Sequence, residues 1–143
     1  MPRSSKQARR EAESSPGPSL AQLIEQAQVD FELDFFGRIL GRHPEYFEAL
    51  RVHASNLAQK KRFDESLQIE RRIIQLRPGD SLAHYNLACS YALLEQPELA
   101  IGTLRKALEL GYRDFRFINQ DHDLDSIRKD PRFRKLIREF EKR

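Results

Sequence analysis

Residues 84–110 read HYNLACSYALLEQPELAIGTLRKALEL, and this stretch decides the fold. When the chain is shifted by 34 residues, the stretch 50–76 falls onto it with most apolar positions in register. The matching pairs are Leu50 and His84, Ala54 and Ala88, Leu57 and Tyr91, Leu67 and Ile101, Ile74 and Leu108, and Leu76 and Leu110. A period of this length is typical of helix pairs that stack into a superhelix with a concave face. The sequence therefore predicts an all-α solenoid, and such concave faces usually bind other proteins.

The second copy carries a recognisable motif. The spacing W-x2-L-G-x2-Y followed by A-x3-F is matched by His84, Leu87, Ala88, Tyr91, Ala100 and Leu104. The chain thereby resembles the tetratricopeptide repeat (TPR) family, and its ending resembles the one seen behind bacterial TPR arrays. The first copy departs from the pattern at His53, Ser66 and Glu70, where the family prefers apolar or small residues. The resemblance implies small repeats of paired helices and a protein-binding function.

The repeat frame predicts the domain organisation. Residues 1–19 are expected to be a disordered basic tail, because they cannot bury enough apolar surface to offset the entropy of ordering. Residues 20–143 are expected to form one TPR-like helical domain. Its parts are an N-terminal half-repeat at 20–44, repeats at 45–78 and 79–111, and a C-terminal cap at 112–143.

Helix boundaries follow from apolar spacing and from helix-breaking residues. Pro78 and Gly111 are expected to end two of the helices, since proline lacks an amide hydrogen and glycine readily forms a left-handed cap. The expected helices are a short one from Leu20 to Ala27, a second over 30–40, then 45–60, 63–76, 80–94 and 97–110, and a final one opened by Asp130 and Pro131.

Composition limits the class of protein. The 143 residues suit one domain, and 39% hydrophobic residues suffice for a modest core. No apolar run reaches the roughly 18 residues that a membrane-spanning helix needs, and no signal-peptide pattern is visible. The single Cys89 excludes an internal disulfide framework. We therefore expect a cytoplasmic protein without a membrane association.

No catalytic or metal-binding pattern emerges from the sequence. Asp121, Asp123 and Asp125 alternate like the first half of a calcium loop, but Ser126 and Arg132 stand where the loop needs glycine and glutamate. A role in helix capping and turns is favoured for these aspartates. His53 and His84 are interpreted as a packed pair, and no phosphate loop or nucleophile elbow is present. We expect a protein that is not an enzyme and uses no cofactor or metal.

The TPR resemblance implies where a partner binds. In the family, side chains of the inner helices line the concave groove, and the matched frame places there Arg51, Ser55, Gln59, Tyr85, Asn86, Cys89, Leu93 and Arg116. Chaperone-binding members hold a peptide carboxylate with basic and Asn side chains in this groove. Arg51 and Asn86 match two of those places, and Arg116 matches a third if an inner helix starts near 114, whereas Ser55 and Gln120 do not match. The carboxylate clamp is therefore the minor alternative to a general peptide or protein partner.

Two other classes of function stay open. Residues 128–143 carry eight basic residues against three acidic ones, which would suit nucleic acid or an acidic partner, although a solvated charged face explains them more simply. A second possibility is self-assembly of copies of the chain through the N-terminal helices. Stacking there would cover an apolar edge around Leu20, Leu23, Phe31 and Phe35.

Overall fold

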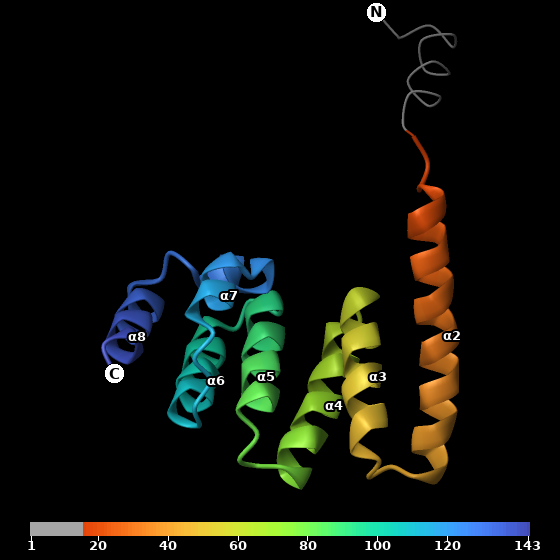
Figure 1. Cartoon of the computed structure of the whole chain (residues 1–143), viewed down its shortest axis with the longest axis horizontal. Coiled ribbons are helices and arrows are strands. Elements are labelled where there is room, and N and C mark those ends of the chain that lie inside the picture. Colours follow the sequence, from red (N-terminus) through yellow and green to blue (C-terminus); the bar gives the residue numbers. More distant parts are fainter. Residues whose placement is uncertain (1–15) are drawn as a thin grey trace, which may run out of the picture. The chain divides into compact units, whose positions relative to one another are not determined.

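The computed structural model describes residues 16–143, which are helical and contain no strand (Figure 1). The α-helices are α2 (Leu20–Arg42), α3 (Phe47–Gln59), α4 (Phe63–Leu76), α5 (Ser81–Leu93), α6 (Pro97–Glu109), α7 (Phe115–Gln120) and α8 (Pro131–Glu141), and a 3-10 helix, η1, covers His122–Ile127. Of the predicted tail, residues 1–15 lie outside the described residues, and 16–19 precede α2 as exposed, non-helical chain. The predicted all-α solenoid of antiparallel helix pairs is confirmed.

The chain divides into two units, Met1–Phe31 and Glu32–Arg143, and the boundary falls within α2. The second unit contains the last part of α2, both predicted repeats and the predicted cap. The packing described below belongs to this second unit.

The N-terminal region corrects one expectation, because a single helix of 23 residues replaces the two predicted helices. Ser19 and Gln22 exchange side-chain to backbone hydrogen bonds of 2.8 and 3.2 Å, the reciprocal arrangement of a capping box, and start the helix. No glycine or proline separates Ala27 from Asp30, so nothing in the local sequence stops the helix there. It ends at Arg42, shortly before Pro44.

The two repeats are the helix pairs α3–α4 and α5–α6. Small side chains lie where paired helices approach closely, and Ala88 on α5 and Ala100 on α6 are fully buried. Leu104 and Leu108 of α6 fill the space beside them in the same apolar cluster. The four predicted helix ranges over 45–110 agree with the structure to within two residues at each end.

The helices α3, α5 and α6 end in the same hydrogen-bonded turn. After α3, the amide of Arg62 donates to the Leu57 carbonyl at 2.9 Å and the amide of Lys61 to the Ala58 carbonyl at 2.9 Å, which is a Schellman motif. The corresponding turn after α5 has Glu95 in the position of Lys61. Both residues have a positive φ, 59° and 55°, and Gly111 after α6 has a φ of 109°.

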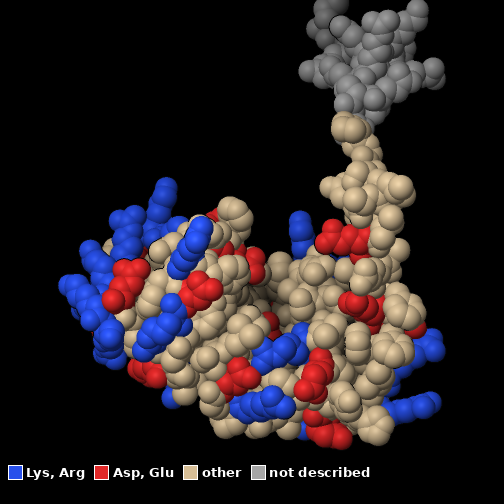
Figure 2. All heavy atoms as spheres, in the orientation of Figure 1, with Lys and Arg blue, Asp and Glu red and all other residues tan. Residues whose placement is uncertain are grey.

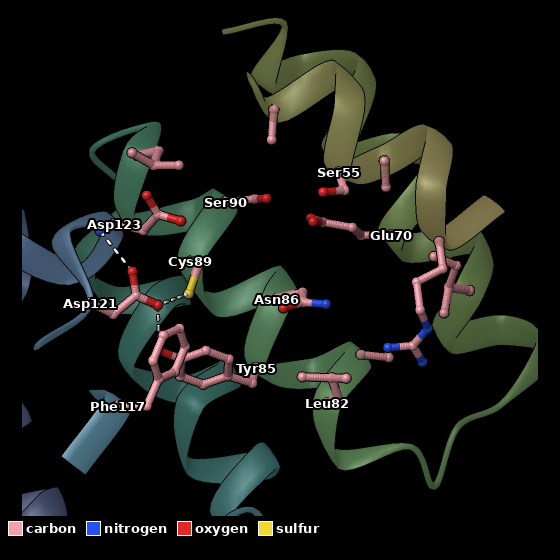
Figure 3. A pocket seen from close by; sticks show the side chains of 16 residues that line it. Ser55, Glu70, Leu82, Tyr85, Asn86, Cys89, Ser90, Phe117, Asp121 and Asp123 are labelled. Atoms are coloured by element: carbon pink, nitrogen blue, oxygen red, sulfur yellow. Dashed lines mark hydrogen bonds between the residues drawn. The ribbon is translucent and has the colours of Figure 1, made fainter. Parts of the chain in front are cut away.

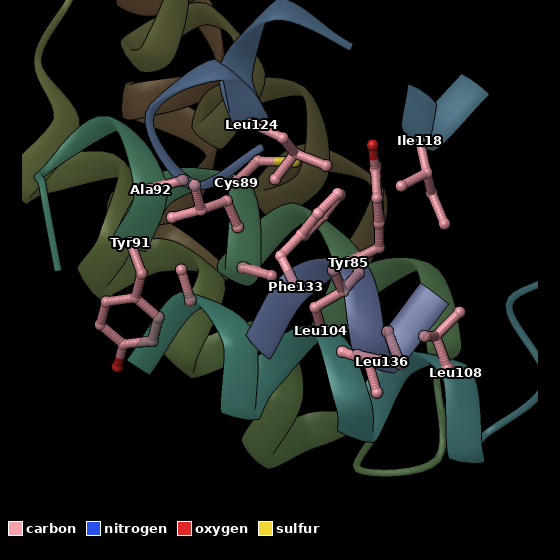
Figure 4. Packing of buried hydrophobic residues seen from close by; sticks show 14 of the residues in the cluster. Tyr85, Cys89, Tyr91, Ala92, Leu104, Leu108, Ile118, Leu124, Phe133 and Leu136 are labelled. Carbon is pink, nitrogen blue, oxygen red and sulfur yellow. The ribbon is translucent and has the colours of Figure 1, made fainter. Parts of the chain in front are cut away.

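The predicted cap covers the end of the second repeat. Phe133, Leu136 and Phe140 of α8 are buried in the same cluster as Leu104 and Leu108 of α6. Figure 4 shows Phe133, Leu136, Leu104 and Leu108 of this cluster. The η1 segment adds Leu124 and Ile127 to this cluster, and Ser126 donates a hydrogen bond of 2.8 Å to the Ala92 carbonyl of α5. The cap residues therefore complete the core of the second repeat.

Candidate partner-binding groove

A cavity of about 430 Å³ lies between the inner helices of the two repeats. The molecular surface is hollowed between α5 and the α3–α4 pair (Figure 2), and the close view shows side chains from both sides facing this space (Figure 3). The lining residues come from α3, α4, α5, α7, η1 and the residue between α7 and η1: Arg51, Ala54, Ser55, Ala58, Glu70, Ile73, Leu82, Ala83, Tyr85, Asn86, Cys89, Ser90, Leu93, Phe117, Asp121 and Asp123. We call this cavity the groove.

Six of the eight predicted binding residues line the groove, namely Arg51, Ser55, Tyr85, Asn86, Cys89 and Leu93. Gln59, the last residue of α3, and Arg116 of the short α7 are exposed and lie outside the lining. The 34-residue frame thus brings the inner-helix positions of the two repeats together. It does not extend to α7, where the repeat pattern has dissolved.

Tyr85 corrects the expectation that this side chain projects into the groove toward a partner. It is 1% exposed, and its ring stacks on Tyr112 with centroids 4.3 Å apart and planes 5° from parallel. Its hydroxyl donates a hydrogen bond of 2.6 Å to Asp121, and burial raises the pKa of Tyr85. Tyr85 is therefore part of the wall that joins α5 to the cap.

Arg51 is already engaged within the chain. Its guanidinium forms an ion pair of 2.8 Å with Asp80 and lies 4.8 Å above the ring of Phe47. Asp80 also caps α5 by accepting a hydrogen bond from the Ala83 amide, a role that the sequence analysis missed. Arg51 therefore ties α3 to the start of α5, and its replacement would cost stability.

The carboxylate-clamp set does not come together. Arg116 lies outside the groove and Asp80 balances the charge of Arg51, so no unpaired cation among the described lining residues faces a peptide carboxylate. Asn86 points into the groove (Figure 3), and within residues 16–143 its side-chain amide has no hydrogen bond. Ser55 is exposed on the facing helix, and its hydroxyl likewise has no partner in that part of the chain.

Glu70 lines the groove, although the repeat pattern predicted no binding role for it. The residue is 7% exposed, and its Oε2 is buried without a hydrogen-bond partner in the described chain. Burial raises the pKa of Glu70 to about 7, Asp123 raises it further, and the nearby hydroxyls of Ser90 and Ser66 oppose the shift. The available signal was the departure of positions 66 and 70 from the TPR pattern.

A second acidic group lies at the end of the groove next to η1. One ligand atom each of Cys89, Asp121 and Asp123 lies within 4.8 Å of the other two, a spacing that a metal ion could bridge. Asp121 is occupied, however, because one oxygen accepts from Tyr85 and the other from the Asp123 amide at 3.0 Å. Burial and the two carboxylates raise the pKa of the Cys89 thiol, which disfavours the thiolate that a metal needs.

Of the two other aspartates in this part of the chain, Asp130 starts the final helix as the sequence predicted, whereas Asp125 forms ion pairs and does not cap a helix. Asp125 pairs with His122 at 3.1 Å and with Arg128 at 3.3 Å, while Asp130 accepts from the Arg132 amide and caps α8. The expected histidine pair is not formed by contact. His84 lies 2.9 Å from the Asp80 carbonyl, while His53 faces Gly37 of α2.

Comparisons with known proteins support the fold. No family model matches the chain. Over 83 residues, or 56% of the chain, it is 34% identical to a chloroplastic protein of Arabidopsis thaliana, and it spans only 25% of the length of that protein. The structure resembles that of MamA (41-end) from Desulfovibrio magneticus RS-1 with a TM-score of 0.67 and 20% identity, covering 85% of the chain and 68% of the MamA chain. The fold is therefore TPR-like. No helix in residues 16–143 is long and apolar enough to cross a membrane.

Proposed function

We propose that this chain is a non-catalytic protein interaction module, an adaptor or scaffold, that binds a peptide or protein segment in the groove. The TPR-like fold supports a protein partner, since stacked helix pairs present an extended concave surface. The proposal includes a cytoplasmic site of action, no cofactor and no metal.

The observation that carries the proposal is the chemistry of the groove lining. Apolar side chains of α3 and α5, among them Ala58, Leu82 and Leu93, alternate with polar groups that have unused hydrogen-bonding capacity. Asn86 offers both donors and an acceptor, and Ser55 offers a hydroxyl, without an internal partner in residues 16–143. A concave, mainly apolar surface with a few unpaired polar groups is the usual form of a binding site.

The test places a photo-cross-linking residue in the full chain at Ser55 or Asn86, with Gln68 and Lys106 of the outer helices as control positions. Peptides selected from a random displayed library serve as the probe. We expect cross-links from the groove positions, and an affinity loss of about tenfold for Asn86→Ala with an unchanged melting temperature, because this amide has no internal partner in the described chain. Binders that cross-link only from Gln68 or Lys106, or a library without binders, would contradict the proposal.

The basic surface of α8 supports a second candidate function. Lys and Arg side chains gather over the end of the molecule where α8 lies (Figure 2). Lys129, Arg134 and Arg138 border a hollow together with Phe133 and Ile137, and within the described chain none of these three cations forms an ion pair. Nucleic acid or an acidic protein would suit this surface. Binding of a DNA duplex that weakens steeply with salt and is lost on charge reversal of Arg134 and Arg138 would support this candidate.

Homo-oligomerisation through α2 stays a prediction. Leu20, Leu23 and Ile24 are 73%, 48% and 59% exposed. Sedimentation of the full chain over a range of concentrations tests this prediction. If copies associate through these side chains, the mass should rise with concentration. The mass of Leu23→Glu should stay that of one chain.

A further inference from the structure

The charges that line the groove do not balance. Among its described lining residues the acids are Glu70, Asp121 and Asp123, and the only base is Arg51. The Arg51 charge is already neutralised by Asp80, which does not line the groove. Arg128, a base of the cap, donates to the backbone carbonyls of Ile118 and Asp121 and not to an acid of the groove. The groove therefore carries an excess of negative charge.

Glu70 turns this charge excess into a candidate site. The residue is more than nine-tenths buried, and its Oε2 has no partner among residues 16–143. Its side chain extends from α4 into the groove toward Ser90 of α5 (Figure 3). A buried acceptor without a donor destabilises the free protein, because the water that it has lost is not replaced. A ligand that donates a hydrogen bond to Oε2 would remove this cost.

The shape of the groove indicates which donor fits. Leu82, Leu93 and the exposed face of Phe117 provide apolar walls, and the carboxylates of Glu70 and Asp123 lie among them. Lysine and arginine have the matching structure, with an apolar stem that packs along such walls and a charged, donating end. The carboxylate of Asp123 has no hydrogen bond in the described chain and is available to the same charge.

We propose that Glu70 and Asp123, supported by Asp121, form a pocket that binds the cationic end of a lysine or arginine side chain of the partner segment. This inference rests on the proposed function, since it names the chemistry that the groove selects. Glu70 and Asp123 contact the bound cation. Asp121 contributes its negative charge while its oxygens hold Tyr85 and the Asp123 amide in place.

The test uses nonapeptides blocked at both ends, with random flanks and a fixed central residue that is lysine, arginine, norleucine or glutamate. Norleucine keeps most of the lysine stem and removes the charge. We expect the lysine or arginine pool to bind the full chain at least tenfold more tightly than the norleucine pool. This preference should disappear in Glu70→Gln and shrink in Asp123→Asn, and it should persist in Glu109→Gln, whose exposed carboxylate lies on α6 outside the groove.

The pH dependence of binding provides a second readout. Because burial raises the pKa of Glu70 to about 7, a bound cation must displace a proton from part of the population, and affinity for the basic pool should rise between pH 6 and pH 8. Of the other groups that line the groove, Arg51 on α3 is paired with Asp80, and raised pKa values keep Tyr85 and Cys89 on α5 protonated over this range. Asp123 of η1 also faces this space, and burial raises its pKa above the ordinary value of 3.8. The slope should vanish in Glu70→Gln.

Three results would overturn the inference. Equal affinity for the norleucine and lysine pools, with cross-linking still from Asn86, would leave the proposed function intact and remove the cation pocket. A basic preference that survives in both Glu70→Gln and Asp123→Asn would place the cation elsewhere. Stoichiometric binding of ZnCl2 alone that is lost in Asp123→Asn, without any basic preference, would make the acidic end of the groove a metal site.

Discussion

Glu70 shows how one side chain couples the stability of this protein to its groove. The native chain holds the Glu70 proton up to about pH 7, whereas the unfolded chain releases it near the ordinary value of 4.5. Between these values the native state binds more protons than the unfolded state, so the free energy of unfolding falls as pH rises. The burial of Glu70, whose Oε2 has no hydrogen-bond partner in residues 16–143, therefore lowers the free energy of unfolding at neutral pH relative to pH 4.5.

The first prediction is that Glu70→Gln stabilises the chain at high pH. The glutamine amide has the same shape as the carboxyl group and no charge. The free energy of unfolding of the variant should therefore exceed that of the native chain by about 1 to 3 kcal/mol at pH 8 and should not exceed it at pH 4. Urea unfolding of both chains from pH 4 to pH 8 measures the difference between their free energies of unfolding. The other acids contribute equally to both chains, so their contributions cancel in this difference. Glu109→Gln, on an exposed site of α6, should follow the native curve. A gain for Glu70→Gln that is the same at every pH would contradict the buried-acid account.

The second prediction concerns the hydrogen bond of 2.6 Å from the Tyr85 hydroxyl to the Asp121 carboxylate. These residues are 36 positions apart in the sequence, and their hydrogen bond joins α5 to the cap. Tyr85→Phe removes the donor and leaves the carboxylate short of a hydrogen bond, so we expect a loss of about 1.5 to 3 kcal/mol in the free energy of unfolding. Tyr112→Phe is the matched control, because Tyr112 shares the stacked ring pair and its hydroxyl has no hydrogen bond in residues 16–143. Equal effects of the two substitutions in urea unfolding would show that the stacked rings, and not the hydroxyl, hold the cap.

At the scale of the helices, the turns that close α3, α5 and α6 share one geometry and differ in their residues. Lys61 and Glu95 stand 34 residues apart with a left-handed backbone, and only the third turn uses glycine, at Gly111. A residue with a Cβ atom pays a steric cost of about 1 kcal/mol in this region, whereas glycine does not.

The third prediction is that Lys61→Gly and Glu95→Gly each raise the free energy of unfolding by about 0.5 to 1 kcal/mol, since relief of strain exceeds the entropy that glycine adds to the unfolded chain. Gly111→Ala should lower the free energy of unfolding by about 1 kcal/mol. The methyl group has room at this position, but the φ of 109° is unfavourable for any residue with a Cβ atom. Thermal and urea unfolding measure all three. A stabilising Gly111→Ala would contradict the role given to the backbone.

Which helices could be predicted depended on local signals. Pro78 and Gly111 are sharp terminators, and α4 and α6 end where those residues require. Between Ala27 and Asp30 the sequence offers no terminator, and the apolar pattern alone suggested a break that the backbone does not make. The apolar pattern predicts which face of a helix is buried, whereas the end of a helix is set by backbone chemistry.

At the scale of the whole molecule, the groove combines positions that a repeat frame can predict with positions that it cannot. The inner-helix residues Ser55, Asn86 and Cys89 recur every 34 residues or share the same helix face, and they line the groove together. Glu70 reaches the groove from an outer helix, and Asp121 and Asp123 come from the cap, where the period has ended. The sequence showed the alternating acids Asp121 and Asp123 and the departure of Glu70 from the TPR pattern, but tertiary packing alone brings these three side chains to one groove.

The last prediction concerns the cap as a structural part of the solenoid. Phe133, Leu136 and Phe140 are 3%, 1% and 1% exposed and share one core with Leu104 and Leu108 of α6. A chain ending at Lys129 loses these three side chains, each of which contributes about 1.5 to 3 kcal/mol through burial, and it exposes the apolar face of α6. We expect it to aggregate or to melt at a much lower temperature, which light scattering and thermal unfolding would show. A chain that lacks residues 1–18 instead is the control. It should match the intact chain, because the removed segment has no apolar pattern to bury and Ser19, which caps α2, is kept. If the truncated chain does not aggregate and is as stable as the intact chain, packing of α8 on α6 does not stabilise the fold. The contribution of α8 would then be its basic surface alone.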